Sequence, residues 1–156
     1  MNPSNTAKST ELQVMIWFLA EGWEIFTPVS DLYGTDLVVR DQKTRRLLAV
    51  QVKHKQHGSL NEGRLPKGWS GPHPPFDFLV FYAPETERGL VIPAQRLEKE
   101  GQAFIFYTKD ASGYSTGSVR PLFAPFAFSF RDVPHEQRAS HFVKRFHEIT
   151  SADHGV

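Results

Sequence analysis

Residues 34–53 read GTDLVVRDQKTRRLLAVQVK, and this stretch decides the fold class. Residues 35–40 are strand-like, residues 41–45 are a polar turn, and residues 47–53 alternate between apolar and other side chains. Two such stretches joined by a short turn predict an antiparallel hairpin. Because side chains alternate between the faces of a strand, we expect Gln51 and Lys53 to share one face.

Elements with other periodicities flank this hairpin. Apolar residues at helical spacing predict an N-terminal helix that begins near Ser9 and stops at Gly22, and a short strand at 23–29 should follow. Leu12, Met15, Ile16 and Leu19 recur at helical spacing, and the expected packing side of this helix also includes Phe18. Glu11 lies in the same arc, which places its carboxylate on the packing side of the helix or at its border.

The rest of the chain alternates between strands, loops and helices. Gly and Pro residues predict an irregular loop at 54–75, and a Gly/Ser-rich stretch predicts another at 111–118. Apolar runs predict strands at 77–83, 89–92 and 102–108. Helices are expected at 93–100 and 134–149, and an extended segment at 122–130 should lay Phe126, Phe128 and Phe130 on one face, against the core or against a second subunit. The order is mixed α/β.

The length and composition of the chain exclude several classes of protein and of functional site. A chain of 156 residues matches one domain, and we expect a single domain over residues 1–156. The absence of cysteine excludes disulfides, thiolate zinc sites, iron-sulfur clusters and thiol nucleophiles. The longest apolar run, 14–20, is far shorter than the roughly 20 residues that cross a bilayer. We therefore expect a cytoplasmic protein without a membrane partner.

Charge is distributed unevenly along the chain. The formal net charge is +1, yet residues 40–67 hold eight basic residues against two acidic ones. A phosphate backbone is the expected partner of such a segment, because phosphates attract clustered Lys and Arg. The residues expected to contact DNA lie on or after the second hairpin strand and are Lys55, His57, Arg64 and Lys67.

The residues with the most informative chemistry lie on the hairpin. Asp36 opens the first strand, and Gln51 and Lys53 project from its partner, so a carboxylate, an amide and an ammonium group can converge. Phosphodiester hydrolysis needs these groups, because Mg²⁺ prefers oxygen ligands and a neighbouring Lys can position or deprotonate water. The sequence contains neither a P-loop nor a GxGxxG motif.

The arrangement resembles the PD-(D/E)xK nuclease superfamily, in which an acidic residue on one hairpin strand precedes an acidic-x-Lys triplet on the next. The resemblance covers about residues 9–108, and the QxK form is similar to intron-encoded homing endonucleases and to small restriction-type and resolvase-type nucleases. It implies a restriction-endonuclease-like α/β core with a mixed central sheet flanked by helices.

The same resemblance implies a metal-dependent DNA endonuclease. Glu11, Asp36 and Gln51 would hold Mg²⁺, for which Mn²⁺ can substitute, and Lys53 would orient or activate the water. Such nucleases commonly act as homodimers or homotetramers, and the Phe-rich segment 122–130 is the candidate interface. Gln51 departs from the family pattern, and since a neutral amide binds a hard cation more weakly than a carboxylate does, Glu11 and Asp36 would supply the negative charge.

Three other functions remain open from the sequence. A Holliday-junction resolvase would cut four-way junctions in preference to linear duplex. A non-catalytic DNA-binding module on the same fold would retain DNA without cutting it. An interaction protein would use the surface of Phe126, Phe128 and Phe130 to bind a partner, and would not bind DNA.

Overall fold

The structure, a computed structural model, describes residues 3–29, 35–54, 75–99 and 121–152. None of the helices in these segments is long and apolar enough to cross a membrane. In chain order the elements are α1 (Pro3–Ala20), β1 (Glu24–Phe26), β2 (Leu37–Arg40), β3 (Leu47–His54), β4 (Phe78–Ala83), β5 (Arg88–Pro93), α2 (Ala94–Lys99), the 3-10 helix η1 (Pro121–Phe126), β6 (Ala127–Ser129), the 3-10 helix η2 (His135–Gln137) and α3 (Arg138–Ala152).

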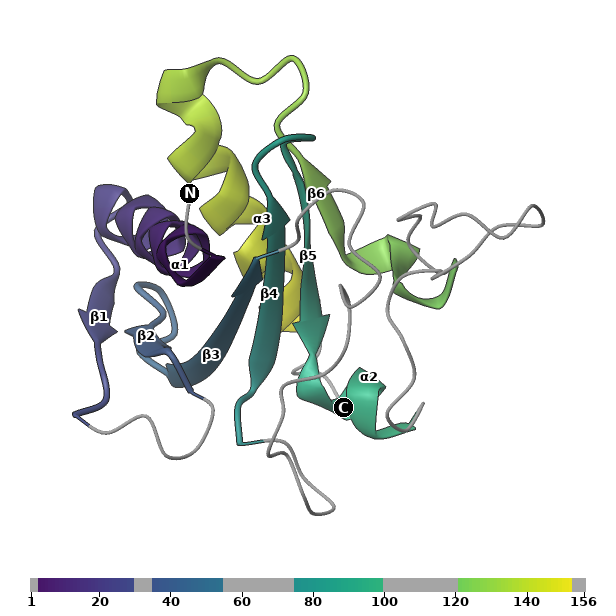
Figure 1. Ribbon diagram of the computed structural model, residues 1–156. Coiled ribbons are helices and arrows are strands. Elements are labelled where there is room, and N and C mark those ends of the chain that lie inside the picture. Colours follow the sequence, from purple (N-terminus) through teal and green to yellow (C-terminus); the bar gives the residue numbers. More distant parts are fainter. Residues whose placement is uncertain (1–2, 30–34, 55–74, 100–120, 153–156) are drawn as a thin grey trace.

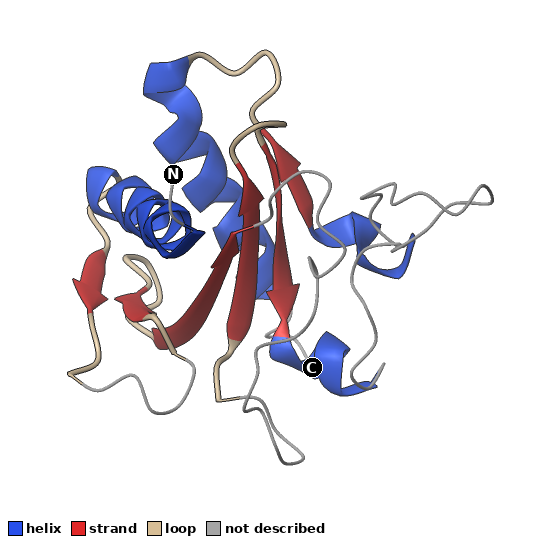
Figure 2. Cartoon of the chain, viewed as in Figure 1, coloured by secondary structure: helices blue, strands red, loops and turns tan. Residues whose placement is uncertain are grey.

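The described strands form one mixed sheet in the order β1-β2-β3-β4-β5-β6 (Figure 1). β3 and β4 run parallel, and the other neighbouring pairs run antiparallel. α1 and α3 pack against each other and cover one face of the sheet, and η1 packs on the other face at β5 (Figure 2). The expected α/β class, with a mixed central sheet flanked by helices, is confirmed.

The predicted hairpin is present as β2 and β3. Leu37 pairs with Val50, and Val38 pairs with Ala49. Leu48, Val50 and Val52 are buried against α1 and α3, on what we call the helix-covered face. Alternation places Ala49, Gln51 and Lys53 on the opposite face, which we call the site face. Gln51 and Lys53 therefore share a face, as the sequence predicts.

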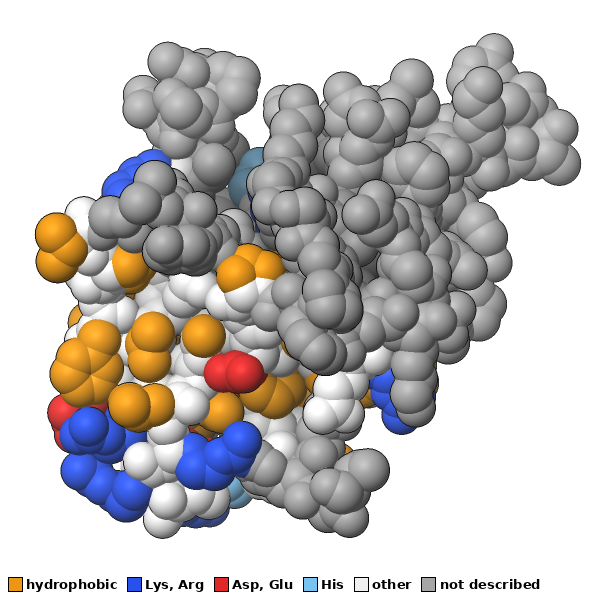
Figure 3. Space-filling model, turned by 90° about the horizontal axis from the view of Figure 1, so that it is seen from below, with side chains coloured by type: hydrophobic (Ala, Val, Ile, Leu, Met, Phe, Trp, Pro, Cys, Tyr) orange, Lys and Arg blue, Asp and Glu red, His pale blue; other side chains and the backbone are white. Residues whose placement is uncertain are grey.

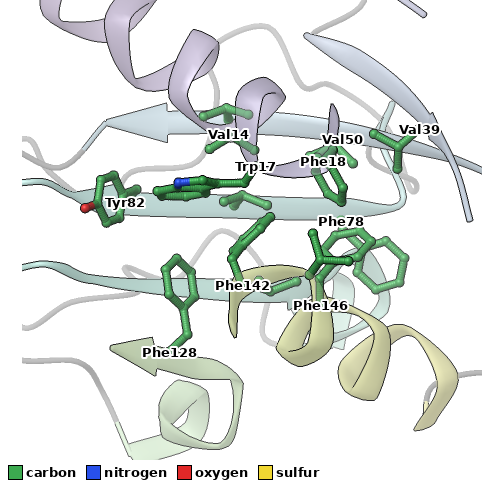
Figure 4. Close-up of a cluster of buried hydrophobic side chains, with 14 of the residues drawn as sticks. Val14, Trp17, Phe18, Val39, Val50, Phe78, Tyr82, Phe128, Phe142 and Phe146 are labelled. Carbon is green, nitrogen blue, oxygen red and sulfur yellow. The ribbon is translucent and has the colours of Figure 1, made fainter. Parts of the chain in front are cut away.

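Aromatic side chains fill the core between the helices and the sheet (Figure 4). The Phe142 ring of α3 lies 4.9 Å from Trp17 and 5.3 Å from Phe18, both on α1. Phe146 lies 4.9 Å from Phe18 and 5.6 Å from Phe78 of β4. Such tilted and edge-on pairs add to the stabilisation from burial. α3 is thus part of the main core, with Phe142, Phe146 and Ile149 buried.

The expected packing face of α1 is wrong for Leu12, Ile16 and Leu19, whereas Phe18 is buried and Met15 packs against the core, as expected. The side chains that enter the core are Val14, Trp17 and Phe18, whereas Leu12, Ile16 and Leu19 are 47%, 55% and 56% exposed. Apolar residues line both sides of this helix, so apolar spacing alone does not select the buried side. The larger aromatic side chains occupy the core because they bury more apolar area per residue.

The Phe-rich segment also differs from expectation. Its first half is the 3-10 helix η1, with Pro125 inside it, and only Ala127–Ser129 form a strand. Phe128 and Phe130 are 4% and 0% exposed in the main core. They cannot form an exposed interface, so the hypotheses that this segment joins subunits or binds a protein partner are wrong for these two residues.

Several element boundaries also differ. The strand expected at 23–29 is limited to β1, since Pro28 has no N–H to donate to a neighbouring strand. The helix expected at 93–100 is α2, and Pro93 belongs to β5. The expected strand at 102–108 and loop at 111–118 lie outside the described residues, as do residues 55–74 of the expected loop.

A buried carboxylate shapes the β2–β3 turn, residues Asp41–Arg46. Asp41 Oδ1 accepts hydrogen bonds from the N–H groups of Lys43 and Thr44 at 2.8 and 3.1 Å, and Oδ2 lies 3.0 Å from His147 Nδ1 of α3. Burial opposes ionisation of Asp41, but the two N–H groups and His147 outweigh it and hold the pKa of the carboxyl below its ordinary value of 3.8. The turn is therefore tied to α3.

We expect Asp41→Asn to lower the free energy of unfolding at neutral pH by about 1–3 kcal/mol, because the amide replaces a charged acceptor that is 4% exposed. Since the folded pKa lies below the unfolded value, ionised Asp41 stabilises the fold above about pH 4. This contribution is lost as the pH falls through the folded pKa. Urea unfolding at pH 7 and at about pH 3 should show the gap between wild type and variant narrowing. Exposed Asp132→Asn is the control, and a gap of constant size would contradict this account of Asp41.

Candidate active site

Asp36 lies at the start of β2, with its carboxylate against β3. Its N–H donates to the carbonyl oxygen of Val50 at 3.0 Å, and its Oδ2 accepts a hydrogen bond from the N–H of Val52 at 2.7 Å. Val52 lies between Gln51 and Lys53 in the chain. The structure therefore brings Asp36 to the part of β3 that carries the other two predicted site residues.

Gln51 lies on β3 between Val50, whose carbonyl oxygen accepts the Asp36 N–H, and Val52, whose N–H donates to the Asp36 carboxylate. The Gln51 residue is 8% exposed, and its Oε1 is buried without a hydrogen-bond partner among the residues that the structure describes. A buried acceptor left unsatisfied costs about 1–3 kcal/mol. Native proteins rarely keep such an atom without a reason, and an oxygen ligand for a cation is one such reason.

Lys53 is two residues further along β3, at the carboxyl end of the strand, and is half-buried. It pairs with Phe81 of β4, whose side chain belongs to the smaller apolar cluster beside the site face. The backbone of Lys53 is thus fixed on a central strand of the sheet.

Glu11 lies on α1, and its carboxylate oxygen is 3.7 Å from Lys8 Nζ. Its side chain is 22% exposed, at the border of the helix face that packs on the sheet. In the described part of the chain, no three His, Asp or Glu side chains form a metal-ligand group. The structure joins Asp36 to β3 directly, whereas the role of Glu11 as a metal ligand stays a prediction.

Thr10 and His54 are two residues that the sequence reasoning missed. Thr10 Oγ1 lies 2.7 Å from His54 Nδ1, and Thr10 is 2% exposed. This contact joins the middle of α1 to the end of β3, at the residue after Lys53. Thr10 is four residues before Val14 and seven before Trp17, so its place on the buried side of α1 could have been found from that alternative helical spacing.

The remaining predicted contacts with DNA are not placed. Lys55, His57, Arg64 and Lys67 all lie outside the described residues. Their assignment to DNA binding stays a prediction.

The donor set of the site suits a hard divalent cation. Asp36 offers a carboxylate and Gln51 an amide oxygen, and Mg²⁺ takes oxygen ligands while keeping several waters. The partnerless Gln51 Oε1 agrees with this choice. Lys53 adds a positive group on the same sheet face, where it can contact an anionic substrate or a water.

Comparisons with known proteins add one similarity. No protein-family model and no curated protein matches the chain. Among solved structures, the chain is similar to the bacterial homing endonuclease I-Ssp6803I, with 24% sequence identity and a TM-score of 0.48. The similarity covers 60% of this chain and 67% of the other.

Proposed function

We propose that the protein is a metal-dependent endonuclease that hydrolyses phosphodiester bonds in double-stranded DNA. One observation carries the proposal: the buried, partnerless Oε1 of Gln51 lies on the strand against which the Asp36 carboxylate is held. The carboxylate is held at the backbone of Val52, the residue that follows Gln51. Keeping an unfavourable polar atom at one place is typical of a functional site.

Asp36 and Gln51 are the residues that would hold Mg²⁺ or Mn²⁺, with Glu11 as a further candidate ligand. A bound divalent cation neutralises phosphate charge and lowers the pKa of a coordinated water. Asp36 supplies negative charge, and its hydrogen bond to the Val52 N–H fixes the direction of the carboxylate. Gln51 contributes a neutral oxygen that needs no deprotonation.

Lys53 would act on the substrate side of the site. Its ammonium group can orient the attacking water or stabilise the charge that develops on the phosphate in the transition state. Cutting both strands of a duplex needs two sites, so the proposed active form is a homodimer or a homotetramer.

Gln51 provides the test of this proposal, because its substitution should affect the stability of the fold and the binding of the metal differently. Gln51→Leu removes a buried unsatisfied acceptor, so we expect unchanged or higher stability, by about 1 kcal/mol. It also removes an oxygen ligand, and we expect the Mg²⁺ concentration for half-maximal DNA cleavage to rise about tenfold or more. Gln51→Glu adds a carboxylate and should need no more Mg²⁺ than wild type.

The measurements are plasmid cleavage as a function of Mg²⁺ concentration, with EDTA as the blank, and urea unfolding of each variant. If Gln51→Leu cleaved DNA with the Mg²⁺ dependence of wild type, Gln51 would not be a ligand. If cleavage persisted in EDTA, the metal dependence itself would be wrong.

A further inference from the structure

The β2–β3 turn presents basic side chains at the opposite end of the hairpin from Gln51 and Lys53. Lys43, Arg45 and Arg46 are exposed in this turn. Arg40 precedes it, with its guanidinium 5.3 Å from the centre of the Phe26 ring and 3.1 Å from Glu24. The same Glu24 lies 3.5 Å from Arg45. One carboxylate thus faces two guanidinium groups, so the patch keeps a net positive charge.

Several hydrogen bonds, and a contact with α3, hold the backbone conformation of this turn. The Asp41 carboxylate bonds two N–H groups of the turn and lies against His147, and the Asp41 N–H donates to the carbonyl oxygen of Arg46 at 2.8 Å. Arg45 has a φ of 65°, a conformation that favours glycine. The turn therefore holds its basic side chains in a fixed arrangement, which lowers the ordering cost of binding.

The turn and the site lie along one open side of the sheet. Alternation places Asp36, Val38 and Arg40 on the site face of β2, as it places Leu47 and Gln51 on the site face of β3. The part of this face near the turn is uncovered, since Phe26 and Leu47 are 43% and 54% exposed. Figure 3 shows Lys and Arg side chains gathered at one corner of the molecule beside exposed hydrophobic side chains.

The distance between the turn and the site corresponds to a short length of DNA backbone. Leu47 and Lys53 are six residues apart on β3, which is about 20 Å at roughly 3.3 Å per residue. One DNA strand advances about 3.4 Å per nucleotide, so the same distance spans about six base pairs. We propose that the β2–β3 turn is a second DNA contact, binding backbone phosphates about six base pairs from the bond cut at Asp36, Gln51 and Lys53. This inference rests on the proposed function for its substrate.

The test compares two double variants that remove the same charge. Lys43→Gln with Arg46→Gln changes the turn and keeps its backbone bonds. Arg88→Gln with Arg131→Gln changes two exposed basic residues near β5 and β6, at the other edge of the sheet from β1 and β2. Binding to a random duplex of about 30 base pairs is measured over a salt series without divalent metal, and cleavage is measured separately in Mg²⁺.

The turn variant should lower the slope of log K against log salt by about 2, since each phosphate contact contributes about 0.9. The other double variant should keep the wild-type slope. Equal slopes for the turn variant and wild type, equal losses in both variants, or no DNA binding by wild type would each overturn the proposal. A changed slope in a protein that cuts no DNA would keep the turn as a DNA contact and refute the endonuclease.

Discussion

Asp36→Asn should lower the single-turnover rate of DNA cleavage in Mg²⁺ by about 10²–10³-fold or more, because it removes the charge that would hold the cation. Asparagine has nearly the same size as aspartate, and its Oδ1 can still accept the hydrogen bond from the Val52 N–H. The substitution thus separates the charge of the site from the packing of the hairpin. Rates are measured with protein in excess over a duplex substrate, after unfolding curves have shown that the variant is folded.

Asp77→Asn is the matched control for this variant. Asp77 precedes β4, and its Oδ2 accepts a hydrogen bond from the N–H of Ala49 at 2.8 Å, much as Asp36 does from Val52. Asp77 is outside the proposed site, so Asp77→Asn should change the cleavage rate less than about threefold. Similar losses in both variants would mean that the bond from carboxylate to backbone, and not a metal site, explains the effect of Asp36.

Phe142→Ala should lower the free energy of unfolding by about 3–5 kcal/mol, a large part of the 5–15 kcal/mol typical of a small domain. Phe142 is 0% exposed, and its ring contacts Trp17, Phe18 and Phe128 at 4.9–5.3 Å. The alanine would leave a cavity where α1, α3 and β6 meet. Urea or guanidinium unfolding measures the change.

Phe26→Ala is the control for the core prediction. Phe26 is 43% exposed on β1, and its loss should cost about 1 kcal/mol or less. If Phe142→Ala were no more destabilising than Phe26→Ala, the C-terminal helix would not be part of the main core.

The hairpin was predictable because its information is local. The alternation over 47–53 places Gln51 and Lys53 on one face, and the structure confirms both the β2–β3 pairing and the shared face. The antiparallel pairing of β2 with β3 also brings Asp36, which immediately precedes β2, next to β3. Sequence reasoning was therefore most accurate where a two-residue period and a short turn determine which residues meet.

The packing of α1 and of the Phe-rich segment was not predictable in the same way. Both sides of α1 carry apolar residues. Whether Leu12 or Val14 enters the core depends on which side of α1 packs against α3 and the sheet. In the Phe-rich segment, alternation describes Phe128 and Phe130, but Pro125 lies within a 3-10 helix. The spacing of apolar residues does not tell the buried side of a helix from its exposed side, nor a strand from a 3-10 helix.

Contacts between distant residues were also missed. Asp41 and His147 are 106 residues apart, and Thr10 and His54 are 44 residues apart. No local pattern pairs such residues, since their meeting depends on how α1 and α3 pack on the sheet. Both pairs tie a helix to β3 or to the turn before it, so they fix the two ends of the strand that carries the candidate site.

The most direct test of the central claim is the nicking of supercoiled plasmid by purified protein in Mg²⁺, with wild type and Asp36→Asn compared at equal concentration. The proposed site predicts conversion to nicked or linear DNA by wild type, none in EDTA, and at least about 10²-fold slower conversion by Asp36→Asn. Equal cleavage by the two proteins would contradict the proposed site, and intact plasmid with folded, DNA-bound wild type would contradict the endonuclease.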